Sequence, residues 1–251
     1  MNAALTTEAV KFRHATVVRA STLLMVLGIA VICSSFQLAA GTDDPQLAAK
    51  LGPLIDPGGW NGYLATAAQV TGAAGLLAQG VVVSWLFGRE FADGTITALF
   101  ALPVPRRSLA AAKLVIYLAW SACASCALLV ALVVLGFTAG LGAIPGDAVP
   151  DLGRQLALSV LTGAIAVPAA WATTAARSVL AGIATTIGIV VLSQLSAVAG
   201  AGGWFPFAAP ALWAISAGTE VSAVQLLLVV PVVLSAAALA VLSWHRLQLD
   251  R

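Results

Sequence analysis

Long apolar runs alternate with short polar segments along this chain. A helix that crosses the roughly 30 Å hydrocarbon core of a bilayer needs about 20 predominantly apolar residues. Six runs reach this length, at residues 21–40, 63–87, 114–137, 155–175, 179–198 and 221–244. Because the runs are continuous and do not alternate, we expect helices and not the strands of a membrane barrel. The pattern predicts an all-α integral membrane protein with one transmembrane domain over residues 1–251.

Charge supports this prediction and orients the chain. Only 9% of residues are charged, against about a quarter in soluble domains. With six spans both termini lie on one side, and ten of the twelve Lys and Arg residues fall there, in the N-terminal arm, the segment 88–113, Arg177 and the tail 245–251. Only Lys50 and Arg154 lie opposite. Since basic loops stay inside, we expect both termini to be cytoplasmic and the protein to be multi-pass in a plasma or inner membrane.

The first apolar run has an alternative interpretation as a signal peptide, because LAAG at 38–41 is a plausible cleavage site. The run exceeds the 7 to 15 residues usual for the apolar region of a signal, however, and Glu8 places an acid in the preceding arm. We therefore expect a retained span.

The sequence lacks the residues that several kinds of function require. No ionisable residue lies near the middle of a predicted span, which disfavours a proton-driven carrier. The spans offer no nucleophile with a base and no metal-ligand set, so we expect no catalytic residue, metal or cofactor in this chain. Cys33, Cys123 and Cys126 are interpreted as packing residues. None of the three lysines lies in a phosphate-binding loop, so energy for active transport would come from another subunit.

The segment 88–113 is a charged island between two spans. Gly94 can end the preceding helix, and Thr95 can cap a new short helix over 95–102. That helix is expected to be amphipathic, with Ile96, Leu99 and Phe100 on one face, Pro103 and Pro105 at its end, and Arg106 and Arg107 toward anionic lipid or an acidic partner. The simpler alternative is an ordinary basic loop.

Part of this island resembles a known family. The string EFADGTITALFALPVPRRSLAAAK at 90–113 is similar to the pattern E-x-x-x-G-T, P-V-x-R and K found between the second and third spans of ABC-2 type permease subunits of ABC exporters. The matching residues are Glu90, Gly94, Thr95, Pro103, Val104, Arg106 and Lys113. The basic arm, the six spans and the chain length agree with the plan of that family.

The resemblance implies a function and partners. In that family the loop is a coupling helix seated on a separate ATPase, which binds ATP and Mg²⁺, and the N-terminal arm is an elbow helix. Two permease chains, identical or different, join two ATPase chains, and no nucleic acid is involved. Carried over, the elbow is expected within 1–20, chiefly at 6–19. The residues that would couple to the ATPase are Glu90, Gly94, Thr95, Phe100, Pro103, Arg106 and Arg107.

Small and polar residues form a stripe on two predicted spans, within an arc of about 100° in the second. They are Gln69, Gly72, Leu76, Gln79 and Gly80 in the second span, and Gly182, Thr185, Thr186, Ser193 and Ser196 in the fifth. Such residues commonly let helices approach closely. Alternatively, as family resemblance implies for these two spans, Gln69, Gly72, Gln79, Thr185, Ser193 and Ser196 line a translocation path between two protomers. That path would suit an amphipathic or apolar substrate.

Two further features complete the expected architecture. Pro168 and Pro231 are expected to kink the fourth and sixth spans, and the segment 200–213 to form a short re-entrant or lid-like element at the outer interface. Two rival functions are a stand-alone channel or secondary carrier and a structural or assembly membrane protein. A neighbouring reading frame for a soluble P-loop protein would favour the exporter.

Overall fold

The computed structural model describes residues 2–40, 59–100 and 104–248, which fold into helices and turns with no strand among them. Six helical units in this described part are long and apolar enough to cross a membrane. They are Thr16–Ala39, Gly59–Ala92, Arg106–Thr138, Val149–Ala176, Val179–Val198 and Ala223–His245. The six predicted spans are thus confirmed as helices. The second and third extend further than predicted, so that much of the charged island is helical.

The first two spans each contain one π-helical turn. The first comprises α2 (Thr16–Leu23), η1 (Leu24–Gly28) and α3 (Ile29–Ala40), and the second α5 (Gly59–Val70), η2 (Thr71–Gly75) and α6 (Leu76–Ala92). The third is the single helix α8 (Arg106–Thr138), the fourth α9 (Val149–Ile165) with α10 (Pro168–Ala176), the fifth α11 (Val179–Val198), and the sixth α13 (Ala223–Leu227) with α14 (Val229–His245).

Both prolines interrupt their spans, as predicted. Pro168 is the first residue of α10, after a turn that ends α9 at Ile165. In the sixth span α13 ends at Leu227, four residues before Pro231. A proline ring clashes with the carbonyl four residues earlier and offers no N–H to it, which accounts for the position of this break.

The segment 200–213 forms no span. It contains the short helix η3 (Gly202–Trp204) and the start of α12 (Ala209–Ile215). The α12 helix packs against α5 and α9, and Ala211 lies so close to Gly72 that a Cβ built on that glycine would be 3.0 Å from the Ala211 Cβ. This agrees with a short element that dips between spans.

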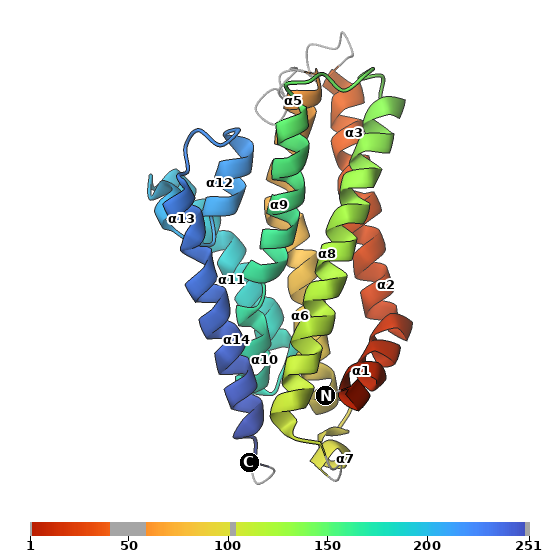
Figure 1. Cartoon of the computed structure of the whole chain (residues 1–251), viewed down its shortest axis with the longest axis vertical. Helices are drawn as coiled ribbons and strands as arrows, with labels where there is room; N and C mark the ends of the chain where they lie inside the picture. Colours follow the sequence, from red (N-terminus) through yellow and green to blue (C-terminus); the bar gives the residue numbers. More distant parts are fainter. Residues whose placement is uncertain (1, 41–58, 101–103, 249–251) are drawn as a thin grey trace.

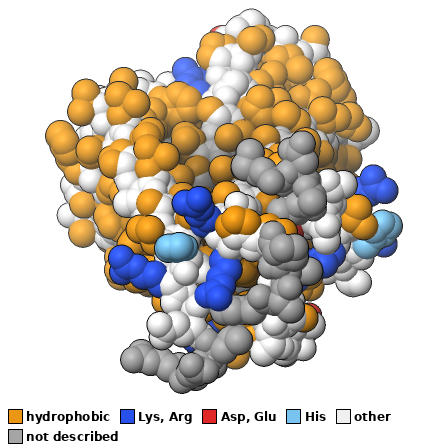
Figure 2. Space-filling model, turned by 60° about the horizontal axis from the view of Figure 1, so that its bottom comes forward, with side chains coloured by type: hydrophobic (Ala, Val, Ile, Leu, Met, Phe, Trp, Pro, Cys, Tyr) orange, Lys and Arg blue, Asp and Glu red, His pale blue; other side chains and the backbone are white. Residues whose placement is uncertain are grey.

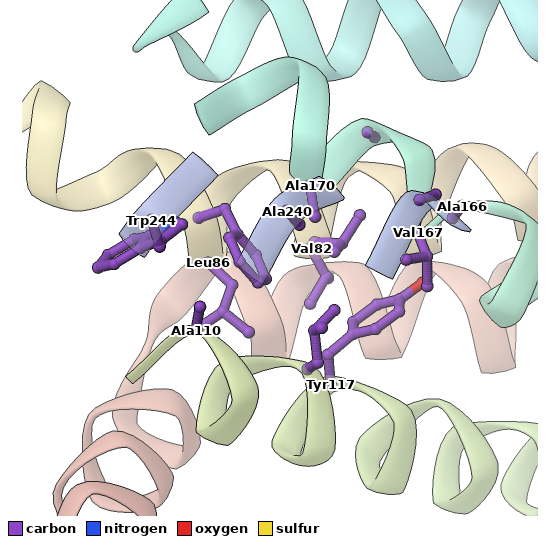
Figure 3. Close-up of a cluster of buried hydrophobic side chains, with 14 of the residues drawn as sticks. Val82, Leu86, Ala110, Tyr117, Ala166, Val167, Ala170, Ala240 and Trp244 are labelled. Carbon is purple, nitrogen blue, oxygen red and sulfur yellow. The ribbon is translucent and has the colours of Figure 1, made fainter. Parts of the chain in front are cut away.

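Both chain ends lie at one end of the bundle, together with α1 (Asn2–His14) and α7 (Ile96–Phe100) (Figure 1). The apolar core near this end joins the second, third, fourth and sixth spans. Figure 3 shows its side chains, among them Val82, Leu86, Ala110, Tyr117, Ala166, Val167, Ala170, Ala240 and Trp244. This core holds four spans together near the end of the bundle that carries both termini (Figure 1).

The second and fifth spans approach closely through small residues. A Cβ built on Gly80 would lie 2.2 Å from the Thr186 side chain, and one on Gly182 would lie 2.4 Å from the Ser84 hydroxyl. Such distances are possible only without a side chain. Gly80, Gly182 and Thr186 of the two predicted stripes therefore pack α6 against α11 within one protomer.

The predicted elbow is divided differently. We expected one element over 6–19, but α1 ends at His14 and Ala15 is extended, with φ −72° and ψ 128°. Thr16 then begins α2, so residues 16–19 belong to the first span. That boundary was wrong, because the extended residue ends the helical hydrogen bonding and lets α1 turn to pack against α8.

Candidate functional site

The charged island is a short helix between two long ones. The second span ends in a turn where Gly94 has φ +65°, a backbone conformation that favours glycine. Helix α7 follows at Ile96–Phe100, and α8 begins at Arg106. A helix thus lies within the predicted range 95–102, over Ile96–Phe100, while 101–103, including Pro103, and the Phe100 side chain lie outside the described residues. Gly94 and Thr95 are exposed.

Four charged side chains meet at the base of this segment, and we call Glu8, Arg89, Glu90 and Lys113 the ion cluster. Arg89 Nη2 donates to Glu8 Oε2 at 2.6 Å, and its Nε donates to Glu90 Oε1 at 3.0 Å. Lys113 Nζ lies 2.7 Å from Glu90 Oε1 and 3.0 Å from Glu8 Oε2. Two acids and two bases therefore alternate around one centre.

The ion cluster is buried, and Lys113 has no exposed area at all. The Lys113 ammonium also donates to the Leu86 carbonyl at 2.9 Å and lies 5.5 Å from the centre of the Trp244 ring. Buried charges are tolerated only when they are paired and hydrogen-bonded. Since its members come from α1, α6 and α8, the cluster fastens the N-terminal helix to both spans that carry α7.

Sequence reasoning missed the roles of Glu8 and Arg89. Glu8 is the only acid among the first 20 residues, and this isolated acid in a basic arm was the available signal. Its partner Arg89 lies 81 residues away, so no local pattern pointed to the pair. Glu90, predicted to couple to the ATPase, is largely buried in the ion cluster, and its coupling role stays a prediction.

Burial of these acids leaves a basic surface at the end of the bundle that carries both termini. Figure 2 shows Lys and Arg side chains over this end, with very little acidic surface among the atoms that it colours. Arg13, Arg19, Arg107 and Arg246 are exposed there. The surface suits anionic lipid or an acidic partner, as predicted for Arg107.

Arg106 contacts the C-terminal tail. One of its guanidinium nitrogens donates to the Leu247 carbonyl, and Arg177 Nη2 donates to the Gln248 carbonyl at 2.6 Å. Arg106 begins α8, whereas Arg177 lies between α10 and α11. The tail thus bridges the start of the third span and the turn before the fifth.

A second buried polar group lies within the spans and is centred on Gln79. The Gln79 amide donates to the Ser159 carbonyl at 3.0 Å and to Thr162 Oγ1 at 2.9 Å, and its oxygen accepts from the Ser121 hydroxyl. Gln79 has no exposed area. It therefore joins α6 to α8 and α9 within one protomer.

The six residues predicted to line a path do not form one surface. Gln69 is exposed, Gln79 is buried, and Gly72 packs near α12. Thr185, Ser193 and Ser196 are half-buried on α11, where their hydroxyls donate to carbonyls of the same helix. The path stays a prediction. In this structure Gln69 is available to a partner and Gln79 is not.

A known protein family matches most of this chain. The model of the family described as "ABC-2 family transporter protein" matches residues 4–193, a range that includes most of α1, the ion cluster, α7 and most of the fifth span. The chain belongs to the ABC-2 transporter family. Its family is one of transporter proteins, and the described residues include six helices long and apolar enough to cross a membrane.

One relative of this ABC-2 protein is the bacitracin transport permease protein BCRB of Bacillus licheniformis. The two are 46% identical over 46 residues. The matched stretch is 18% of this chain and 22% of the relative. The chain thus matches about a fifth of that protein.

The Gln79 contacts predict a stability effect. Gln79→Leu should destabilise the protein by about 1–3 kcal/mol, because it leaves buried partners on α8 and α9 without a hydrogen bond. Gln69→Leu, a matched change on the exposed face of the same span, should be near neutral. Thermal unfolding of both variants in detergent tests this. Equal unfolding midpoints would contradict the structural role of Gln79.

Acid should weaken the attachment of α1. Burial alone would raise the pKa of Glu8, but the charges of Lys113, Arg89 and Lys11 outweigh it, so the pKa lies below its ordinary value. A lowered pKa gives stability that is present above the unfolded value, about 4.3, and is lost as pH falls through the folded value. Glu8→Gln should therefore lower the unfolding midpoint at pH 7, and by less as the pH falls below about 4. A difference in unfolding midpoint between Glu8→Gln and the wild type that stayed the same at every pH would contradict this prediction.

Proposed function

We propose that this chain is the permease subunit of an ATP-driven exporter and is moved by a separate cytoplasmic ATPase that docks on α7. The observation that carries the proposal is the attachment of α7. This short helix projects at the end of the bundle that holds both termini (Figure 1), between two long spans joined by the ion cluster.

This attachment suits the transmission of force. The second and third spans carry Arg89, Glu90 and Lys113 at their inner ends, and α1 carries Glu8. Closure of the ATPase on ATP would push α7. Because the helix ends are locked together, the two spans and α1 would tilt as one body and switch access to the path.

The working complex has two permease chains, identical or different, and two ATPase chains that bind ATP and Mg²⁺. The excess of basic residues at the end bearing α7 supports a cytoplasmic location for both termini in a plasma or inner membrane. The path between protomers would include the exposed Gln69 and the α11 hydroxyls. The name of one relative includes bacitracin, so bacitracin is the first substrate to assay.

Gly94 provides the test of coupling. Gly94→Val forces a β-branched residue into positive φ, at a strain of about 1–3 kcal/mol, and should lower substrate-stimulated ATP hydrolysis by roughly fivefold or more. Gly94→Asn is the matched control, since asparagine tolerates this conformation. The Gly94 position has open space around it, so both variants should fold. Unchanged stimulation in Gly94→Val would exclude coupling through this loop.

Purification separates the exporter from its rivals. The wild-type protein should co-isolate with a nucleotide-hydrolysing subunit, and a channel or secondary carrier should not. A transport assay in vesicles should then show that export requires ATP. Transport without that subunit would favour the carrier.

A further inference from the structure

A cleft lies beside α7, and it contains acids that the chain itself leaves incompletely paired. The cleft has a volume of about 450 Å³ and is lined by residues from α1, α6 and α7. They include Lys11, Trp85, Arg89, Glu90, Asp93 and Leu99. Two of its walls, α1 and α6, are also joined by the ion cluster, and α7 forms the third.

Glu90 is only half satisfied by its own chain. Its Oε1 accepts from both Arg89 and Lys113, but its Oε2 is buried and has no hydrogen-bond partner in the part of the chain that is described. Leaving a buried acceptor unpaired is costly. Arg89 and Lys113 already direct their donors to other acceptors, Glu8 and the Leu86 carbonyl among them.

Asp93 supplies a second carboxylate. It follows the last turn of α6, is exposed, and makes no ion pair with any residue of 2–40, 59–100 or 104–248. Lys11, the base at the rim, is paired with Glu8 at 3.6 Å. An incoming cation would therefore meet the exposed Asp93 carboxylate and the unpaired Glu90 Oε2. The positive charge of Lys11 is already paired with Glu8.

We propose that this cleft is a socket for a basic side chain of the ATPase, an arginine, which pairs with Asp93 and completes the hydrogen bonding of Glu90. The inference rests on the proposed function and names the chemistry of its partner. Arginine fits better than lysine, because its planar group can address two carboxylates at once. The rest of the surface at this end of the protein is basic. Pairing in the socket would therefore also fix the position of the ATPase on the permease.

The test is a charge reversal in the assembled complex. The wild-type permease is reconstituted in lipid nanodiscs, and the dissociation constant of the co-isolated ATPase is measured. Asp93→Lys should weaken binding by roughly tenfold or more, because an unpaired like charge faces the arginine. Glu220→Lys, which reverses an exposed acid in the loop before α13, away from the cleft, should bind within about twofold of wild type.

Rescue identifies the partner residue. Each arginine and lysine of the ATPase is changed to glutamate, and the variants are tested against Asp93→Lys. One arginine reversal should restore most of the lost affinity while weakening binding to the wild-type permease. Wild-type affinity for Asp93→Lys, or failure of every reversal to rescue it, would overturn the socket and leave the exporter assignment standing. If the wild-type permease itself bound no ATPase, the proposed function would fall as well.

Discussion

Replacement of Lys113 by methionine is expected to lower the free energy of unfolding by about 3–5 kcal/mol. Lys113 is fully buried between Glu8 and Glu90. Methionine keeps much of the side-chain length but removes the charge, so the two buried carboxylates would keep Arg89 as their only buried base, with the half-exposed Lys11 3.6 Å from Glu8. Much of one negative charge would remain uncompensated in the protein interior, which costs several kcal/mol.

Two comparisons make the Lys113 measurement specific. Arg107→Met removes an exposed charge from the first turn of the same helix and should change stability by no more than about 0.5 kcal/mol. The double variant Lys113→Met with Glu8→Gln restores the charge balance, so it should lose less stability than the sum of the two single changes. Unfolding midpoints in detergent are measured for the wild type and for Lys113→Met, Arg107→Met, Glu8→Gln and the double variant. A Lys113→Met midpoint equal to that of Arg107→Met would show that the ion cluster does not support the fold.

Substitution of Gly182 by valine is expected to separate the second, fourth and fifth spans. A Cβ at this position would lie 1.9 Å from Thr173 Oγ1 and 2.8 Å from the Ser84 Cβ. Rotation of the Thr173 hydroxyl would relieve the first contact but not the second, because the Cβ of Ser84 is fixed by its backbone. We expect a loss of about 1–3 kcal/mol or more from this overpacking.

Gly188 supplies the control for Gly182. It lies on the same helix, and a Cβ built there meets nothing within 4 Å. Gly188→Val carries the same change of helix propensity without the clash, so it should retain most of the stability. Monodispersity after purification and the thermal midpoint are the measurements. Similar behaviour of the two variants would indicate that α6 and α11 do not pack closely at this level.

Much of the fold could be predicted from residue order alone. A bilayer demands runs of apolar residues with internally bonded backbones, so the six spans were visible in the sequence, and the helix breaks at Pro168 and before Pro231 follow from local sterics. Gly94 also acts locally, and its positive φ agrees with the prediction of a helix end there. The ABC-2 family was recognisable from the same segment.

The candidate site was less predictable, because its residues come from distant parts of the chain. Arg106 was assigned to lipid or a partner, but its guanidinium reaches the Leu247 carbonyl, 141 residues away. Gln79 and Gln69 share a stripe in the sequence, yet one is buried and the other exposed. Helical periodicity defines a face of a helix but does not say which neighbour will cover it.

The sequence by itself determined that this protein lies in a membrane, that it has six spans, and which end carries the positive charge, since each follows from local composition and length. Only the tertiary structure decided that Glu8 meets Arg89 and Lys113 and that Gly80 and Gly182 bring α6 against α11. The physical reason is that the effect of a buried charge, or of a glycine without a side chain, depends on the groups that it faces. Those groups come from helices that are far apart in the chain and are brought together only by packing.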